Sequence, residues 1–372
     1  MNSLPMTTAE KMLFALLKAA LHGTAGSDVC WKSCTDEDWQ QCYKLASTHG
    51  VMALAWDGIA LQNDGCVPPR ALKLTWGLAV QSYEEKYERY CGTVADLQDF
   101  YAQNNIAMVQ LKGVGLSTYY PVPAHREGGD IDIYTWSAVK SIISDQEANR
   151  LADELMKKQG IDVETDHSPK HSNFYYKGIP VENHKTFLDV FRYKLAAPMN
   201  ELLHTLLNPR EVKLCGGIYQ VHIPSPEFNA LFLTFHAAQH FGNGIRLHHL
   251  LDWAFLLKKY GWCLPKEVTD ERLLDFICAL THLCNRLLDM DIPVKGGEPM
   301  VSIVYEQMMH PLYPPHGGVP VKGVFAILRY KTKRLLYIHR MQAMIFDHSL
   351  WPRIWESIVV HIRKPKTILM RG

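Results

Sequence analysis

Apolar side chains recur every three or four positions over most of the first hundred residues, which is the period of a helix with one buried face. The pattern predicts three helices there, at about residues 7–21, 36–54 and 70–102. Thr7 and Glu10 have the spacing of a capping box, in which each side chain binds the other residue's backbone N–H, so the first helix should begin there. From about residue 226 to the C-terminus the periodicity is again helical, broken by prolines.

Between these helical regions the pattern changes to short apolar or alternating runs, which are typical of strands. Strands are predicted at about 106–111, 131–134, 161–165, 173–176 and 179–184, with helices at 115–120 and 138–159. Pro180 should stand at the start of the last strand or place that strand at an edge, because proline cannot donate to a ladder. We therefore expect an α+β fold, with a small mixed β-sheet core at 104–195, an N-terminal helical region at 1–103 and a C-terminal helical region at 196–372.

Composition narrows the class of protein. The 372 residues are 47% hydrophobic and 21% charged, with a net charge of +1, which argues against a protein that coats long nucleic acid. The nine cysteines form no Cys-x-x-Cys pair and are expected to be reduced, as in a cytoplasmic protein. The apolar run 12–17 ends at Lys18, and no apolar stretch approaches the ~18 residues that a membrane span needs.

Two carboxylates stand next to a pair of glycines in the second predicted strand. Asp130 and Asp132 alternate with isoleucines, so both acids leave one face of the strand while the isoleucines enter the core. Carboxylates so close together repel, and a divalent cation between them makes the arrangement favourable; Mg²⁺ prefers a few carboxylates plus phosphate oxygens. Gly129 would let the backbone approach a ligand closely.

A glycine-bearing turn precedes this strand. Lys112, Gly113 and Gly115 lie between a predicted strand and helix, where backbone N–H groups could cradle a triphosphate or simply form a connection. Lys112 is interpreted as a phosphate clamp, with a solvated turn residue as the alternative. Arg126, in the loop before Asp130, is expected to bind phosphate.

A metal site needs a third carboxylate, and Glu182 is our choice. It shares one strand face with His184, so an acid and an imidazole should project together. The alternative is a surface glutamate beside a structural histidine. Glu164, Asp166 and Asp189 are competing acids.

At this point the chain resembles a known family, the uncharacterised nucleotidyltransferases of the DNA polymerase beta-like superfamily. Three sets of residues carry the resemblance, over about residues 106–257. They are Leu111-Lys112-Gly113 with Tyr120-Pro121 and Arg126; Gly129-Asp130-Ile131-Asp132-Ile133 with Glu182 and His184; and His236, His240, Arg246 and Asp252. Asn183 departs from the family, which more often has an apolar residue there.

The resemblance implies a nucleotidyltransferase core at 104–195 and a role for each of these residues. Asp130, Asp132 and Glu182 would be the catalytic residues and would bind Mg²⁺, with Mn²⁺ as a substitute. The implied nucleotide-binding residues are Lys112, Gly113, Gly115, Arg126, Gly129, His184, His236, His240, Arg246 and Asp252. The expected reaction moves an NMP group from an NTP, such as ATP, to an acceptor hydroxyl on a small molecule, a sugar or a protein; the acceptor's identity and the oligomeric state lie beyond the sequence.

Two other functions stay open. The chain could be a catalytically silent module that binds a nucleotide or a protein partner. It could also be a metal-dependent hydrolase, because His236 and His240 share one helical face and Asp252 could complete a zinc site, although Ala237 stands where a zinc peptidase needs glutamate. Arg246 could bind phosphate or pair with Asp252.

Basic residues gather near the C-terminus, where we expect the wet face of an amphipathic helix rather than a polyanion site. They are Arg329, Lys331, Lys333, Arg334 and Arg340, followed by a tail with Arg363, Lys364, Lys366 and Arg371; Trp351 and Trp355 are expected in the core.

Overall fold

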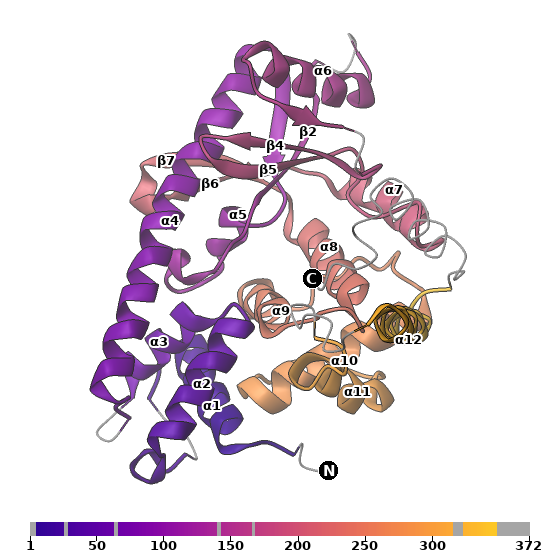
Figure 1. Cartoon of the computed structure of the whole chain (residues 1–372). Helices are drawn as coiled ribbons and strands as arrows, with labels where there is room; N and C mark the ends of the chain where they lie inside the picture. The colour runs from indigo at the N-terminus through magenta and orange to yellow at the C-terminus, as the bar shows by residue number, and fades with distance from the viewer. Residues whose placement is uncertain are drawn as a thin grey trace.

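The computed structural model describes residues 5–25, 29–62, 66–139, 143–165, 168–314 and 323–347, and the fold is α+β (Figure 1). Asp166, the basic tail, Trp351 and Trp355 lie outside the described residues. The helices are α1 Thr8–His22, α2 Asp36–Thr48, α3 Met52–Leu61, α4 Arg70–Gln103, α5 Val114–Ser117, α6 Asp145–Lys158, α7 Ala196–Leu206, α8 Pro226–His240, α9 Leu247–Tyr260, α10 Glu271–Leu288, α11 Glu298–Met309 and α12 Val324–Gln342. The strands are β1 Ile106–Gln110, β2 Ile131–Ser137, β3 Val163–Glu164, β4 His171–Tyr176, β5 Ile179–His184, β6 Arg210–Leu214 and β7 Tyr219–Ile223, and short 3₁₀ helices are η1 Trp31–Ser33, η2 Pro123–His125 and η3 Cys215–Gly217.

The N-terminal helices follow the periodicity closely. The capping box of Thr7 and Glu10 is formed at the start of α1. Helix α4 begins directly after Pro68 and Pro69. One expectation was wrong: the helix predicted at 36–54 is two helices, because Gly50 at φ +66° adopts a left-handed conformation that ends the first one.

The central sheet has five strands in the order β1-β2-β5-β4-β3. β2 and β5 are parallel, and the other neighbours are antiparallel. β5 is therefore interior, so an edge position for it was wrong; Pro180 is its second residue and precedes the ladder with β2, which starts at Val181. Lys177 and Gly178 form the turn that joins β4 and β5, and both residues have positive φ.

Helices cover the sheet from both ends of the chain. α6, capped by Ser144, packs on β2, and α4 packs on β1. In Figure 1, α8 to α12 gather on the opposite side of the sheet from α6, and α4 runs along the sheet towards α1–α3. Buried residues from the N-terminal helices, the sheet and the C-terminal helices form one hydrophobic cluster. The boundaries at 103 and 195 stay a prediction.

The C-terminal helical region also contains an antiparallel hairpin of β6 and β7, which the sequence pattern did not predict. The hairpin packs on α4 and β1 through β7. Its strands alternate, as in the buried Val221 and Ile223 of β7, but they are short and lie between helical segments. The exposed Arg329, Lys333 and Arg340 of α12 fit the expected wet face.

None of the helices in the described ranges is long and apolar enough to cross a membrane. All nine cysteines are free thiols, as the spacing predicted. A cytoplasmic location stays a prediction.

Candidate functional site

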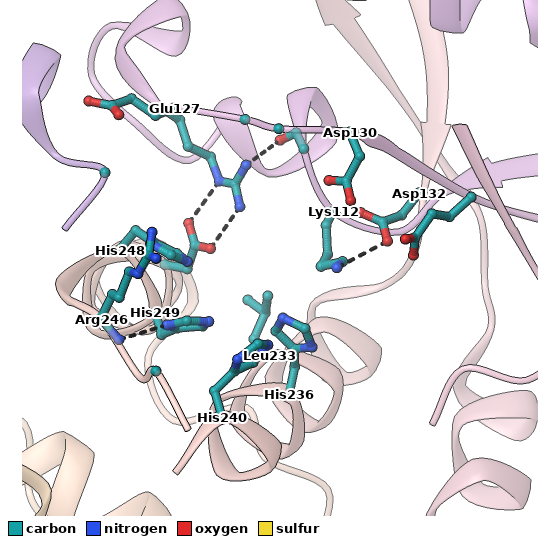
Figure 2. Close-up of a pocket in the computed structure, with 18 of the residues that line it drawn as sticks. Lys112, Glu127, Asp130, Asp132, Leu233, His236, His240, Arg246, His248 and His249 are labelled. Atoms are coloured by element: carbon teal, nitrogen blue, oxygen red, sulfur yellow. Dashed lines mark hydrogen bonds and ion pairs between the residues drawn. The ribbon is translucent and has the colours of Figure 1, made fainter. Parts of the chain in front are cut away.

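A cavity of about 680 Å³ opens between the glycine-rich loop before β2, the sheet, and helices α8 and α9 (Figure 2). All of the residues predicted for the site line this cavity except Gly115 and His184. Figure 2 shows Asp130, Asp132 and Lys112 on one side and His236, His240 and His249 on the other. Residues from 112 to 252 therefore meet at one place in the fold.

The three carboxylates converge because of the strand pairing. β2 and β5 run parallel with Asp132 opposite Glu182, and paired residues point to the same face. Asp130 directly precedes β2. One carboxylate oxygen from each acid lies within 4.8 Å of the others, so the group could hold a metal ion. The competing Glu164 lies on β3, and Asp189 lies 3.7 Å from Arg192.

Asp132 is buried, with 1% of its side chain exposed, and two cationic or polar groups contact its Oδ1. Nζ of Lys112 and Nε2 of His184 each lie 3.0 Å from that oxygen. Burial alone would raise the pKa of Asp132, but the charge of Lys112 and the His184 contact outweigh it and hold the pKa below its ordinary value. Lys112 is thus bound to a carboxylate and is not a solvated turn residue.

The other two acids differ in their surroundings. The charge of Asp132, with burial adding to it, raises the pKa of Asp130. Burial would raise the pKa of Glu182 as well, yet contacts with His171 and His184 lower it to about 2. Nδ1 of His171 lies 2.8 Å from Oε2 of Glu182, and Nε2 of His184 lies 3.6 Å from it. Asp130 therefore carries the unrelieved repulsion of the group.

The glycine turn is tighter than the sequence suggested. Gly113 has φ +61°, a conformation that glycine adopts at little cost, and precedes α5, which is only four residues long. A Cβ on Gly115 would lie 2.7 Å from Cγ2 of Ile223, so this glycine allows the turn to pack on β7 and does not face the cavity. Gly129 lines the cavity, and a Cβ at this position would have no atom within 4 Å. Its carbonyl accepts a hydrogen bond from the Tyr90 hydroxyl of α4 at 2.8 Å.

Arg126 and Asp252 form a buried ion pair. Nε of Arg126 donates to Oδ1 of Asp252 and Nη2 donates to Oδ2, both at 2.8 Å. Nη1 donates to the carbonyl of Gly113 at 3.0 Å. The Tyr120 hydroxyl also donates to Asp252. Pairing of Asp252 with Arg246 was thus wrong, and the fork of Arg126 already holds a carboxylate.

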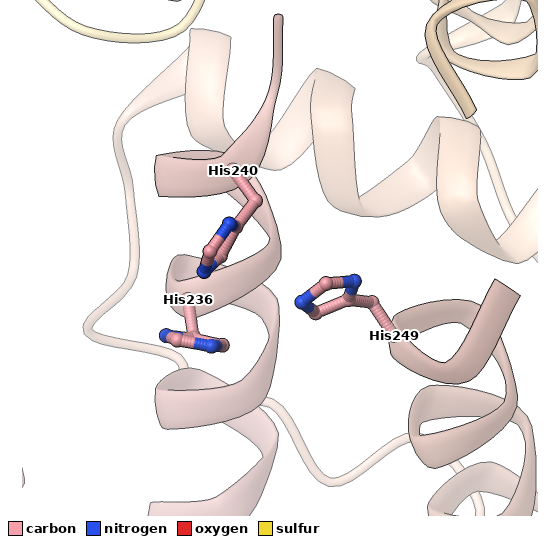
Figure 3. Close-up of side chains that lie close together, drawn as sticks. All are labelled: His236, His240 and His249. Carbon is pink, nitrogen blue, oxygen red and sulfur yellow. The ribbon is translucent and has the colours of Figure 1, made fainter. Parts of the chain in front are cut away.

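Three imidazoles, those of His236, His240 and His249, line the side of the cavity across from the carboxylates (Figure 2), and Figure 3 shows that they lie close together. Ring centroids lie 4.6 Å apart for His236 and His240, and 5.0 Å apart for His240 and His249. Burial lowers the pKa of all three, that of His240 to about 4, so the rings are neutral at pH 7. His249 was not predicted from the sequence; its position in the first turn of α9 points its ring at the two others.

The zinc site with Asp252 was wrong, because Asp252 is held by Arg126 and the third neighbour is His249. His249 is itself a poor metal ligand. Its Nδ1 accepts the backbone N–H of Arg246 at 3.1 Å, which places the proton of the neutral ring on Nε2, the nitrogen that faces the other imidazoles.

Lys170 was also missed. It precedes β4 and lines the cavity. Burial lowers the pKa of Lys170, and the nearby positive charge of Lys112 lowers it further. Of the cavity's cations, Lys170 and Arg246 are the two whose side chains make no hydrogen bond or ion pair with a described residue. Lys170 reaches the cavity because His171 pairs with His184, which places the residue before β4 next to the end of β5.

Asn183, which departs from the family pattern, lies on the face of β5 away from the cavity. Its side chain bonds Thr135, Asn149 and Asp153 beneath α6, at 3.0, 3.1 and 2.9 Å. A buried polar network therefore replaces an apolar contact without disturbing Glu182 or His184.

The chain shows similarity to a protein family and to a solved structure. A model of the uncharacterised nucleotidyltransferase family matches residues 35–289, and no curated protein matches the chain. Among solved structures, the chain is similar to an antigenic nucleotidyltransferase-like protein from Paracoccidioides brasiliensis, with 15% identity and a TM-score of 0.36, over 54% of this chain and 93% of that one. The family match spans more than half of the chain and includes the carboxylates, the glycine turn and the histidine helix. The chain therefore belongs to the uncharacterised nucleotidyltransferase family.

Proposed function

We propose that the protein is a Mg²⁺-dependent nucleotidyltransferase that moves an NMP group from an NTP to an acceptor hydroxyl. The observation that carries the proposal is the convergence of Asp130, Asp132 and Glu182, each of which has a carboxylate oxygen within 4.8 Å of the others. They lie on the wall of a cavity that is also lined by lysine and arginine side chains. Family membership supports the same reaction class.

The residues present fit a magnesium ion. The donors are carboxylate oxygens, which Mg²⁺ prefers, and they come from a strand pair that holds them rigidly. The raised pKa of Asp130 marks a repulsion that a cation would relieve. Lys112 and His184 both contact Oδ1 of Asp132, which leaves Oδ2 for the metal. When bound, Mg²⁺ (or Mn²⁺) would neutralise charge on the phosphates as pyrophosphate leaves.

Cations of the cavity would hold the triphosphate. Lys170 and Arg246 have no described partner and can turn to phosphate oxygens, and Lys112 can contact phosphate while it orients Asp132. Arg126 acts differently: its ion pair with Asp252 and its bond to Gly113 fix the loop and the turn. The neutral imidazoles of His236, His240 and His249 offer uncharged hydrogen bonds to the rest of the nucleotide.

The reaction balances without a further reagent. The acceptor oxygen forms a bond to the α-phosphorus, and the bond from that phosphorus to the bridging oxygen breaks. The electron pair leaves with pyrophosphate, and the hydroxyl proton passes to a carboxylate of the group. Glu182, with its pKa of about 2, is suited to holding metal more than to accepting this proton.

One observation favours a second function, a silent module that binds nucleotide without turnover. Nζ of Lys112, 3.0 Å from Asp132, already supplies a positive charge at the carboxylates. Such a protein would bind NTP but release no pyrophosphate.

The test incubates the full chain with Mg²⁺ and each NTP, and measures binding and pyrophosphate release with a mixture of hydroxyl-bearing acceptors. Wild type is expected to bind NTP and release pyrophosphate, whereas Asp130→Asn and Asp132→Asn should lose release at least 100-fold. Asp291→Asn, at an exposed acid away from the cavity, is the matched control. Binding without release in wild type would favour the silent module, and no NTP binding under any metal condition would refute both.

A further inference from the structure

The carboxylates lie on the border between two hollows. A second hollow, of about 830 Å³, shares Gly129, Asp130 and Glu182 with the main cavity. It extends away from the histidine wall, over β3, β4 and β5, and Tyr175 lines it with 70% of its surface exposed. A molecule bound there would reach the same carboxylates from another side.

Strand pairing connects the two hollows by a row of polar side chains. Asp132 pairs with Glu182, Glu182 with Asn173, and Asn173 with Glu164, so the row crosses four strands on one face of the sheet. Neighbouring strands lie about 4.8 Å apart, which puts Glu164 roughly 10 Å from Glu182. The hollow therefore has polar contacts at the carboxylates and again at its far end.

The hollows differ in charge. The main cavity has five basic lining residues, Lys86, Lys112, Lys170, Arg126 and Arg246, which balance the charge of its five acids, Glu127, Asp130, Asp132, Glu182 and Asp252. Among its lining residues, the second hollow has acids, Asp162 and Glu164 besides the shared Asp130 and Glu182, and no lysine or arginine. A triphosphate belongs in the first hollow and would be repelled from the second.

The geometry of in-line displacement suggests a role for two hollows on either side of the carboxylates. The attacking and leaving oxygens stand on opposite sides of the α-phosphorus. If the basic residues of the main cavity hold the leaving pyrophosphate, the acceptor must approach from the other side of the carboxylates, and the second hollow opens from the shared Asp130 and Glu182.

We propose that the second hollow binds the acceptor, and that the acceptor is a small hydroxyl-bearing molecule with an amine cation, of the amino-sugar class. The inference rests on the proposed function. The amine would pair with Asp162 or Glu164, the sugar face would pack on the ring of Tyr175, and a hydroxyl about 10 Å from the amine would reach the carboxylates. Phosphorylated acceptors and nucleic-acid ends are disfavoured by the same charges.

Two matched sugars test the charge requirement. The β-1,4-linked disaccharide of glucosamine and cellobiose share one skeleton and differ in amine against hydroxyl, and cellobionic acid adds a negative charge. Calorimetry on the full chain is expected to show binding of the diglucosamine at least five-fold tighter than of cellobiose, and none of cellobionic acid. Equal or reversed affinities, or no binding of the diglucosamine, would overturn the proposal.

Variants then locate the site. Asp162→Asn with Glu164→Gln should weaken diglucosamine binding at least five-fold, Tyr175→Ala should weaken it, and Tyr175→Phe, which keeps the ring, should not. Mg²⁺-ATP binding by the Asp162/Glu164 variant should stay within two-fold of wild type, and Asp291→Asn should alter neither. If these substitutions leave the affinity for diglucosamine unchanged, the acceptor site is refuted. Failure of ATP binding alone, with the sugar results intact, refutes the proposed function and not the sugar site.

Discussion

Nε2 of His184 lies 3.0 Å from Oδ1 of Asp132, and both side chains are almost completely buried, at 0% and 1% exposure. His184 does not line the cavity, so any effect of this side chain on a ligand would pass through Asp132. The contact fixes which carboxylate oxygen of Asp132 is left for a cation. We therefore regard His184 as a positioning residue.

Replacing His184 should weaken metal use more than nucleotide binding. His184→Ala is expected to lower Mg²⁺ affinity or kcat about 10–100-fold, which is the usual effect of losing a side chain that orients a metal ligand. The measurement is the Mg²⁺ dependence of pyrophosphate release, and His184→Gln should restore part of the loss by donating to Asp132. His222→Ala, a half-buried histidine on β7, is the control. An unchanged Mg²⁺ dependence in a folded His184→Ala protein would contradict the positioning role.

Much of the fold and of the candidate metal site was predictable because it depends on local periodicity. The alternation around Asp130 and Asp132 and the spacing of Glu182 and His184 fixed which side chains share a face. The pairing of β2 with β5, which sets Asp132 opposite Glu182, is a contact between distant segments and follows only from the tertiary structure.

The same limit explains the residues that were missed or misassigned. Lys170 and His249 reach the cavity only once β4 pairs with β5 and α9 packs against α8. The partner of Asp252 could not be chosen from the sequence either, because both Arg126 and Arg246 were plausible partners. Only the packing of the loop before β2, which carries Arg126, shows which arginine forms the pair. Gly115 looked like a phosphate-binding glycine, yet its neighbour is Ile223 of a hairpin that the pattern did not reveal.

The Arg126–Asp252 pair should be required for stability. Arg126→Ala leaves a buried carboxylate without its partner and is expected to lower the free energy of unfolding by about 3–5 kcal/mol. Arg246→Ala, which breaks no described ion pair, should cost little stability but weaken NTP binding. Urea unfolding followed by circular dichroism distinguishes the two. Equal stability losses would refute the separate roles that we assign to these arginines.

Several buried histidines in and near the cavity should make the protein sensitive to acid. Burial lowers the pKa of His49, His240 and His248 from 6.5 to about 4. Between pH 6.5 and 4 the unfolded chain therefore binds protons that the folded chain does not, so stability falls as pH falls through this window. Each such histidine contributes a slope of up to about 1.4 kcal/mol per pH unit.

His240→Gln should flatten that dependence, because one proton-binding difference is removed. The measurement is the free energy of unfolding at intervals from pH 7 to pH 4. Parallel curves for wild type and His240→Gln would show that His240 is not neutral in the folded protein.

Two of the three glycines predicted to bind the nucleotide, Gly115 and Gly129, should respond differently to alanine. Gly115→Ala places a Cβ 2.7 Å from Ile223, so the turn or β7 must shift, at a cost of about 1–3 kcal/mol for overpacking. Ile223→Ala should recover part of this loss in the double variant. Gly129→Ala has open space around its Cβ and should keep the stability of wild type. Equal thermal midpoints for Gly115→Ala and wild type would contradict the close packing.

Lys170 gives the sharpest test of how the triphosphate is held. Its side chain has no described partner, and its pKa is lowered mainly by burial, so an anion in the cavity would be strongly favoured beside it. Lys170→Ala is expected to weaken Mg²⁺-ATP binding about ten-fold, and Lys170→Met, which keeps the length of the side chain, should weaken it equally. Lys170→Arg should retain most of the affinity, and Lys213→Ala, an exposed lysine on β6, should have no effect. The loss should also be larger for ATP than for AMP if Lys170 contacts the β- and γ-phosphates, as the proposed function requires. If the Lys170→Ala protein bound ATP and AMP with wild-type affinity, the triphosphate would have to bind in another part of the cavity.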